Sequence, residues 1–204
     1  MEVWGLTGPI GSGKSLALDF FAKVQTVFVI DADKVAKEIY EPHFKKFSQF
    51  CKELVKIFGP DVLSKPKGLP QKDFIRSEVS QNPELRVKLE KLIHPLIRKA
   101  IEEKISTADK NSKLVIIEGT RLVESDWAKS LLKGIICVDA PEEMRRQRVR
   151  QRNPKEFNQI WALGRSQDPQ KMKDASQFVW VNDGNKLQLG QNVNQFLKDR
   201  GILE

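Results

Sequence analysis

The stretch of sequence that decides the fold reads Gly8-Pro9-Ile10-Gly11-Ser12-Gly13-Lys14-Ser15. It fits the pattern Gly-x-x-x-x-Gly-Lys-Ser, in which closely spaced glycines let the backbone turn tightly. A short apolar run at residues 3–6 comes before it, and an apolar side of helical spacing continues through residues 15–24 after it. A buried strand, a glycine-rich loop and a helix in this order predict a phosphate-binding loop, or P-loop.

This loop carries the residues that phosphate chemistry needs. Successive backbone N–H groups in such a loop point at phosphate oxygens, and the helix that follows presents the positive end of its dipole to the same anion. Lys14 is expected to reach the β- and γ-phosphates of a nucleotide, and the hydroxyl of Ser15 to bind Mg²⁺. The alternative is a glycine- and serine-rich turn that matches by accident, but its strand-and-helix context favours nucleotide binding.

Four short apolar runs have the pattern of buried strands in a parallel sheet. They are residues 3–6, 27–30, 114–117 and 135–138. Helical patterns separate them, and this alternation predicts an α/β fold with right-handed crossovers. The interval from about residue 37 to residue 107 is too long for one crossover, so we expect a mostly helical insertion there, broken by the turn-rich residues 64–70.

Acidic residues follow the predicted strands, at the edge where open α/β sheets bind ligands. Asp31 and Asp33 come after the second run, and Glu118 after the third. One of the two aspartates is a candidate base for an acceptor hydroxyl, which loses its proton in phosphoryl transfer. Either aspartate could instead cap a helix over residues 34–40. Glu118 is placed like a Walker-B acid, which would hold Mg²⁺ through a water molecule.

Five arginines lie within residues 144–152, and helical spacing puts Arg145, Arg148 and Arg152 on one face. Three interpretations are open. The segment could be the lid of a phosphotransferase, whose arginines neutralise the transferring phosphoryl group. It could bind the backbone phosphates of a nucleic acid, or be a solvated helix paired with nearby glutamates. The P-loop in the same chain favours the lid.

Composition narrows the class of protein. Of the 204 residues, 40% are hydrophobic and 30% are charged, which is typical of a globular protein. No apolar run approaches the ~20 residues of a membrane span, no secretory signal is evident, and Cys51 and Cys137 suggest neither a disulfide framework nor a metal cluster. We therefore expect a cytoplasmic protein. The excess of 35 Lys and Arg over 27 Asp and Glu, a net charge of +8, favours polyanionic partners.

Several segments together give the sequence a likeness to one family. They are residues 5–15, Ile30-Asp31-Ala32-Asp33, Phe58-Gly59 with Gly68-Leu69, residues 89–97 (Leu-Glu-Lys-Leu-Ile-His-Pro-Leu-Ile), Leu122-Val123-Glu124, Arg148 with Arg152, and Asn182-Asp183-Gly184. In this order, over nearly the whole chain, they resemble the dephospho-coenzyme A kinase family. Many kinases share the P-loop, whereas its combination with Asp-Ala-Asp and Leu-Glu-x-x-x-His-Pro is far more specific.

The resemblance implies a P-loop kinase-type three-layer α/β sandwich with a central parallel sheet. Residues 1–36, 112–141 and 176–204 would form the nucleotide-binding core, residues 37–111 a helical domain that binds coenzyme A, and residues 142–175 a lid. The implied reaction passes the γ-phosphate of ATP to the 3′-hydroxyl of dephospho-coenzyme A, with Mg²⁺, in the last step of coenzyme A biosynthesis. ATP and dephospho-coenzyme A are then the expected partners, nucleic acid is less favoured, and no membrane is expected.

Roles for single residues also follow from the resemblance. Asp33 would be the base on the acceptor hydroxyl, and Lys14 and Arg148 would carry the phosphoryl charge. The ATP-binding residues would be Gly8, Gly11, Ser12, Gly13, Lys14, Ser15, Leu16, Arg148 and Arg152. The acceptor would contact Asp33, His94 and Leu122, and Mg²⁺ would lie at Ser15, with Glu118 acting through water. His94, which precedes a proline, has a second interpretation as a packed histidine that caps the N-terminus of a helix.

Several positions depart from the pattern of the family. Gln71 stands where the family has a basic residue, Thr120 begins a segment that is usually Pro-Leu-Leu-Phe-Glu, and Arg145 replaces a glutamine. Residues 176–177, Ser-Gln, stand where Ala-Asp is usual. The phosphate side is thus intact while the acceptor side differs. Arg121 and Arg145 are candidates to replace the charge lost at position 71.

Two other hypotheses stay open at this point. One is a P-loop kinase that acts on another nucleoside- or nucleotide-like acceptor. The other is a non-catalytic nucleotide-binding protein that contacts nucleic acid through residues 145–152. The second predicts oligonucleotide binding that falls steeply with salt and does not depend on Asp33.

Overall fold

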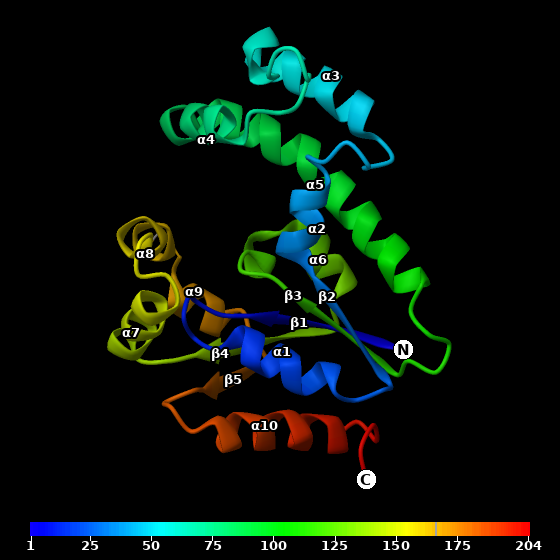
Figure 1. Cartoon of the computed structure of the whole chain (residues 1–204). Coiled ribbons are helices and arrows are strands. Elements are labelled where there is room, and N and C mark those ends of the chain that lie inside the picture. Colours follow the sequence, from blue (N-terminus) through cyan, green and yellow to red (C-terminus); the bar gives the residue numbers. More distant parts are fainter. Residues whose placement is uncertain (166) are drawn as a thin grey trace. The chain divides into compact units, whose positions relative to one another are not determined.

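The structure is a computed structural model that describes residues 1–165 and 167–204 (Figure 1). It divides into two compact units, each with its own core. Unit 1 comprises Met1–Asp31 and Ile105–Glu204, and unit 2 comprises Ala32–Lys104. Among the described residues, no helix combines the length and apolar character that crossing a membrane requires.

In the part of the chain that the structure describes, unit 1 is built on a five-stranded parallel sheet with the order β2-β3-β1-β4-β5 (Figure 1). The strands are β1 (Glu2–Thr7), β2 (Val27–Asp31), β3 (Leu114–Glu118), β4 (Gly134–Asp139) and β5 (Phe178–Val181). The first four contain the predicted apolar runs, which confirms those runs as strands. The sequence did not predict β5, an edge strand in which only Trp180 is buried.

Helices cover both faces of this sheet. They are α1 (Lys14–Ala22), α6 (Asp126–Leu131), α7 (Glu142–Arg152), α8 (Phe157–Arg165), α9 (Pro169–Asp174) and α10 (Lys186–Lys198), with the 3-10 helix η2 (Leu122–Glu124). Alternate residues of β4 point to opposite faces. Ile136 and Val138 pack with residues of α1 and α10, whereas Ile135 and Cys137 pack with Met172 of α9. The predicted three-layer α/β fold is therefore confirmed.

Unit 2 is helical in its described residues, and its core is separate. It contains α2 (Ala32–Glu38), α3 (Phe47–Phe58), the 3-10 helix η1 (Pro60–Val62), α4 (Lys72–Gln81) and most of α5 (Pro83–Ser106). Ile39, Phe50, Leu54, Val62 and Ile75 form its buried centre. Between η1 and α4 the chain turns back on itself, where the N–H of Ser64 donates to the carbonyl of Leu69 at 2.8 Å. The predicted helical character with a break in residues 64–70 is confirmed.

Candidate active site

The P-loop connects β1 to α1, at the edge of the sheet where parallel strands end. Its three glycines adopt positive φ angles of 147° at Gly8, 77° at Gly11 and 106° at Gly13, which residues with a side chain rarely adopt. Space restricts them as well, since a Cβ on Gly8 would lie 2.0 Å from the carbonyl oxygen of Val138. Both backbone conformation and packing therefore require glycine in this loop.

The N-terminus of α1 is built to receive an anion. Gly13 is its N-cap residue, and no described side chain caps the helix there. The side chain of Ser12 is fully buried, and its Oγ has no hydrogen-bond partner among the described atoms. Ser15, in the first turn, is exposed. A helix N-terminus that no described side chain caps, together with an unsatisfied buried hydroxyl, suits the phosphates of a nucleotide.

The ammonium group of Lys14 lies over the beginning of the loop. Its Nζ donates to the carbonyl of Gly8 at 2.8 Å and to that of Pro9 at 3.3 Å. These contacts hold a positive charge at the loop. Leu16, two residues further on, packs its half-buried side chain against the core of unit 1.

Arg148 of α7 also contacts the loop. Its Nη1 lies 3.3 Å from the carbonyl oxygen of Gly11 and 3.4 Å from that of Ser12, and donates to both. Its Nη2 contacts Asn182 as well, so among the described residues the Nε–H is the N–H donor of Arg148 that makes no such contact and can serve an anion. Lys14, Arg148 and the three glycines, predicted from separate segments, thus come together in unit 1.

The other two arginines of the predicted face differ from Arg148. Arg145 is only 8% exposed; its Nε donates to the carbonyl of Ala140 at 3.0 Å, and its guanidinium lies 5.8 Å from the centroid of the Trp161 ring. Arg152 is exposed, and its Nε donates to the side chain of Asn153 at 3.2 Å. Among the described residues, no hydrogen bond joins Arg152 to the P-loop, so its role in ATP binding stays a prediction.

Carboxylates end three strands at the same edge of the sheet: the neighbours β2 and β3, and β4 on the other side of β1. Asp31 ends β2 and is the register partner of Glu118, which ends β3. Asp139 ends β4; it accepts the N–H of Ala140 at 2.8 Å and lies 3.4 Å from Nζ of Lys173. No three His, Cys, Asp or Glu side chains of the described residues are grouped as a metal site.

Two residues with no predicted role contact the loop. Asn182, which follows β5 and is 4% exposed, donates from Nδ2 to the carbonyl of Ser12 at 2.8 Å. Gln167 accepts the N–H of Ile10 on its Oε1 at 2.8 Å. The segment Asn182-Asp183-Gly184 was part of the family resemblance and was the available signal for Asn182. Nothing in the sequence around Gln167 indicates its contact.

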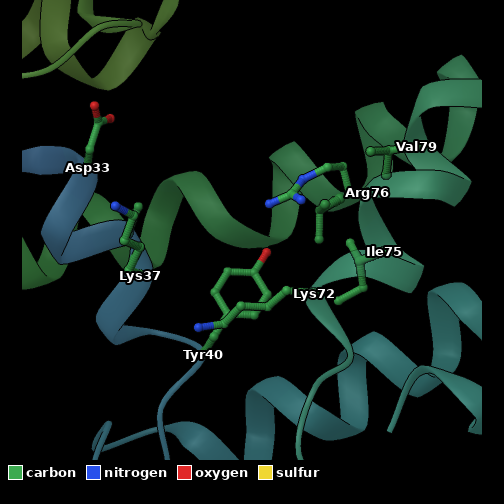
Figure 2. A pocket seen from close by; sticks show the side chains of 9 residues that line it. Asp33, Lys37, Tyr40, Lys72, Ile75, Arg76 and Val79 are labelled. Carbon is green, nitrogen blue, oxygen red and sulfur yellow. The ribbon is translucent and has the colours of Figure 1, made fainter. Parts of the chain in front are cut away.

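Asp33 belongs to unit 2, where it lines a cavity of about 460 Å³ (Figure 2). Three cationic side chains share the cavity with it: Lys37, Lys72 and Arg76. The other lining residues are Ala36, Tyr40, Ile75, Val79 and Leu89. In Figure 2, Asp33 and Lys37 extend from α2, and Lys72, Arg76, Ile75 and Val79 come from α4. One carboxylate, three cations and an apolar wall make this cavity suited to an anionic ligand with an apolar part.

Contacts within unit 2 position these cations. Nζ of Lys72 lies 2.8 Å from Oε1 of Glu41 and 5.7 Å from the centroid of the Tyr40 ring. Lys72 lowers the pKa of the Glu41 carboxyl by this hydrogen bond and by its charge. Burial raises the pKa of Tyr40 to about 12, so the phenol is neutral at physiological pH. Nη1 of Arg76 lies 3.0 Å from Oδ1 of Asp73. Both ion pairs are exposed, which leaves the cations available to a ligand.

Two interpretations as helix caps are wrong, that of Asp33 and that of His94. Helix α2 begins at Ala32, so Asp33 is its second residue and not its cap; only Asp31 precedes the helix. His94 lies in the middle of α5, which begins at Pro83 and continues through Pro95, so it caps no helix. A proline removes one N–H bond and crowds the preceding turn, yet α5 is continuous here, and Ile93 and Leu96 beside the proline pack against the core of unit 2. His94 is half-buried, and its contact with an acceptor stays a prediction.

Leu122 lies in η2 and is 2% exposed. A Cβ built on Gly5 of β1 would lie 3.3 Å from its Cδ1, so the leucine packs against the central strand. Its predicted contact with the acceptor is not tested by this packing.

Comparison with known proteins shows to which family the chain belongs. The model of the dephospho-CoA kinase family matches residues 2–188. The chain belongs to the dephospho-CoA kinase family.

A dephospho-CoA kinase from Acinetobacter baylyi is 35% identical over 195 residues, which are 95% of each chain. The crystal structure of TT1252 from Thermus thermophilus has a TM-score of 0.78 and 27% identity, with 97% of both chains covered. A dephospho-CoA kinase from Campylobacter jejuni, at 24% identity and a TM-score of 0.57 over 98% and 97% of the chains, shares the fold.

The unusual residues of this dephospho-CoA kinase family member have structural contacts of their own. Gln177 accepts the N–H of Ile135 on Oε1 at 2.6 Å, while its own N–H donates to the Ile135 carbonyl at 2.9 Å, which fastens the start of β5 to β4. Gln71 donates from Nε2 to the carbonyl of Asp61 at 2.7 Å. Arg121 donates to the carboxylate of Glu124 at 2.9 Å. Gln177 and Gln71 are therefore used to hold local structure.

Proposed function

We propose that this chain transfers the γ-phosphate of ATP to the 3′-hydroxyl of dephospho-coenzyme A, releasing ADP and coenzyme A. The observation that carries the proposal is the cavity at Asp33, in which the other charged residues, Lys37, Lys72 and Arg76, are cations. Dephospho-coenzyme A has a diphosphate, which suits these cations, and a long arm, which suits the apolar side chains along the same cavity. The hydroxyl to be phosphorylated needs a carboxylate, and Asp33 supplies one.

ATP would bind on unit 1. The uncapped N-terminus of α1 and the P-loop would hold its phosphates, with the ammonium of Lys14 at the β- and γ-phosphates. Arg148 would place its positive charge and its Nε–H beside them. These groups stabilise the negative charge that develops on the transferring phosphoryl group and on the leaving ADP.

The chemical step is then a single displacement. The Asp33 carboxylate accepts the proton of the 3′-hydroxyl as its oxygen forms the new bond to the γ-phosphorus. The bond from that phosphorus to the bridging oxygen of ADP breaks, and Lys14 and Arg148 compensate the charge on the departing oxygen. Proton transfer to a placed carboxylate contributes about 10²–10⁴-fold to a rate.

The donors of this chain fit Mg²⁺ bound together with the nucleotide. Mg²⁺ prefers hard oxygen ligands, keeps several waters and uses few protein groups beside substrate phosphates. Ser15 offers an exposed hydroxyl in the first turn of α1, and Glu118 offers a carboxylate at the end of β3. Ser15 would hold the ion directly and Glu118 through water. When bound, the ion would neutralise phosphate charge and favour the leaving group.

We further propose that residues 142–175 act as a lid and that residues 37–111 hold the acceptor, beside a core of residues 1–36, 112–141 and 176–204. Arg148 supports the first assignment because it contacts the P-loop from α7. The cavity lined by α2 and α4 supports the second. A lid that excludes water would protect ATP from hydrolysis before the acceptor is bound.

The test is ADP release by the purified protein with Mg·ATP, with and without dephospho-coenzyme A. We expect strong stimulation by dephospho-coenzyme A and a product whose mass has increased by one phosphate. Coenzyme A, which already carries the 3′-phosphate, is the matched control and should give no stimulation. If dephospho-coenzyme A gave none either while ATP still bound, the proposed acceptor would be wrong.

A further inference from the structure

The peptide between Ser12 and Gly13 is held from outside the P-loop by Asn182. Asn182 is 4% exposed, and its Nδ2 donates to the carbonyl of Ser12 at 2.8 Å. A Cβ built on Gly13 would lie only 2.1 Å from this Nδ2. The amide of Asn182 therefore occupies space that is open only because position 13 is glycine.

The same asparagine also contacts the lid arginine. Nη2 of Arg148 donates to the carbonyl oxygen of Asn182 at 3.1 Å and lies 3.4 Å from its Oδ1. Asn182 is itself fixed to the sheet, because its N–H donates to the carbonyl of Asp139 at 2.7 Å. One buried residue at the end of β5 thus connects the sheet, the P-loop and Arg148.

Through the geometry of the peptide bond, the contact of Asn182 with the Ser12 carbonyl also affects the N–H of Gly13. In a trans peptide the C=O and the N–H point in opposite directions. When Asn182 holds the carbonyl of Ser12, it therefore also sets the direction of the N–H of Gly13. Gly13 is the N-cap residue of α1, a helix that no described side chain caps. Its N–H is one of the donors that a P-loop directs at phosphate.

We infer that Asn182 is a positioning residue for nucleotide phosphate, which acts through the Ser12–Gly13 peptide and through Arg148. The inference rests on nucleotide binding by the P-loop, which is part of the proposed function. Asparagine suits this place because its short side chain has both a donor, used on Ser12, and an acceptor, used on Arg148. Aspartate has the same shape but only acceptors, so it would set a carboxylate oxygen against the carbonyl of Ser12.

The matched control lies three residues further along the same loop. Asn185 accepts the N–H groups of Leu187 and Gln188 on Oδ1 at 3.0 Å and 3.2 Å, and so caps α10. Asn185→Ala removes a helix cap and lowers Tm, yet no described contact links its side chain to the P-loop. It separates loss of stability from loss of phosphate positioning.

The experiment measures the Kd of Mg·ADP by calorimetry for the wild type, Asn182→Asp, Asn182→Ala and Asn185→Ala, at a temperature where circular dichroism shows each to be folded. We expect both Asn182 variants to raise Kd about tenfold or more, since in both the carbonyl of Ser12 loses its buried donor. In turnover, KM for ATP should rise while KM for the acceptor stays constant. Asn185→Ala should leave Kd unchanged.

Wild-type affinity in Asn182→Asp would overturn the inference, as would an equal loss in Asn185→Ala. Asn182→Asp keeps the volume of the side chain, so it decides the question if Asn182→Ala does not fold. ADP binding requires no acceptor. A wild type that binds ADP but ignores dephospho-coenzyme A would therefore count against the proposed function and leave the Asn182 result standing.

Discussion

Gly11 of the P-loop lies directly against the main chain of Arg145 on α7. A Cβ built on Gly11 would lie 2.6 Å from the carbonyl oxygen of Arg145 and 3.0 Å from its Cα. The φ angle of Gly11, 77°, excludes most residues independently. This contact sets how near α7 comes to the loop, and with it the position of Arg148 one turn further along the helix.

Gly11→Ala should therefore weaken Mg·ADP binding about tenfold or more, because the loop or α7 must move and backbone strain is added. The control is Gly68→Ala, where φ is 63° but no atom lies within 4 Å of the added Cβ. It should cost about 1–2 kcal/mol of stability from strain alone and leave Kd unchanged. Calorimetry with thermal unfolding checks both variants. Unchanged ADP affinity in Gly11→Ala would show that the contact between Gly11 and the main chain of Arg145 does not determine nucleotide binding.

Asp33→Asn should lower turnover at least about 100-fold while the Kd of Mg·ATP stays the same, because the amide cannot accept the hydroxyl proton. Asp31→Asn is the comparison, since Asp31 ends the preceding strand and lies only two residues away. Steady-state rates and ATP titrations of the two variants distinguish them. A greater loss of turnover in Asp31→Asn would reassign the base.

The parts of this protein that could be predicted are those that local patterns encode. The order of apolar run, Gly8–Ser15 loop and helix depends on neighbouring residues, and so do the four apolar runs that form β1 to β4. β5 was not predicted, although residues 178–181, Phe-Val-Trp-Val, are an apolar run of the same kind; in the structure this run pairs with β4 at the sheet edge, where Phe178, Val179 and Val181 are exposed.

Long-range packing explains the remaining differences. From the sequence, Arg145 is expected to be solvated or to bind phosphate. In the structure it is buried, because its guanidinium packs near the ring of Trp161 and donates to the carbonyl of Ala140. Pro95 suggests a break, yet α5 continues through it. The cavity at Asp33 could not be foreseen because α2 and α4 are far apart in sequence and meet only in the folded unit.

Lys72→Met should raise KM for dephospho-coenzyme A about tenfold without changing KM for ATP, because it removes one cation from the cavity at Asp33. Lys56→Met is the matched control: Lys56 is 69% exposed, lies on α3 outside the cavity, and pairs with Glu53 as Lys72 pairs with Glu41. Its kinetics should match the wild type. Initial rates over a range of both substrates give the two constants, and an unaltered acceptor KM in Lys72→Met would place the acceptor elsewhere.

Arg148→Ala should lower kcat about 100-fold or more, because it removes a guanidinium from the phosphate site. Arg146→Ala, a change to the exposed neighbour on the same helix, should have no effect on turnover. Binding of a short single-stranded oligonucleotide is measured in parallel at two salt concentrations. If both arginines contributed equally to a salt-sensitive oligonucleotide affinity and neither affected turnover, residues 145–152 would be a nucleic-acid surface.

The buried thiol of Cys137 makes stability depend on alkaline pH. Burial, and to a smaller extent the charge of Asp139, raises the pKa of this thiol from 9.0 to about 11, although Lys14 and Lys173 oppose the shift. Between these values the unfolded chain loses the thiol proton while the folded chain keeps it. The free energy of unfolding should therefore fall as pH rises from 9 to 11, by at most roughly 3 kcal/mol.

Cys137→Ala lacks this group, so the stability difference between wild type and variant should shrink over the same window. Urea unfolding of both proteins below pH 9 and near pH 11 measures it, and a constant difference would mean that the thiol titrates equally in the two states.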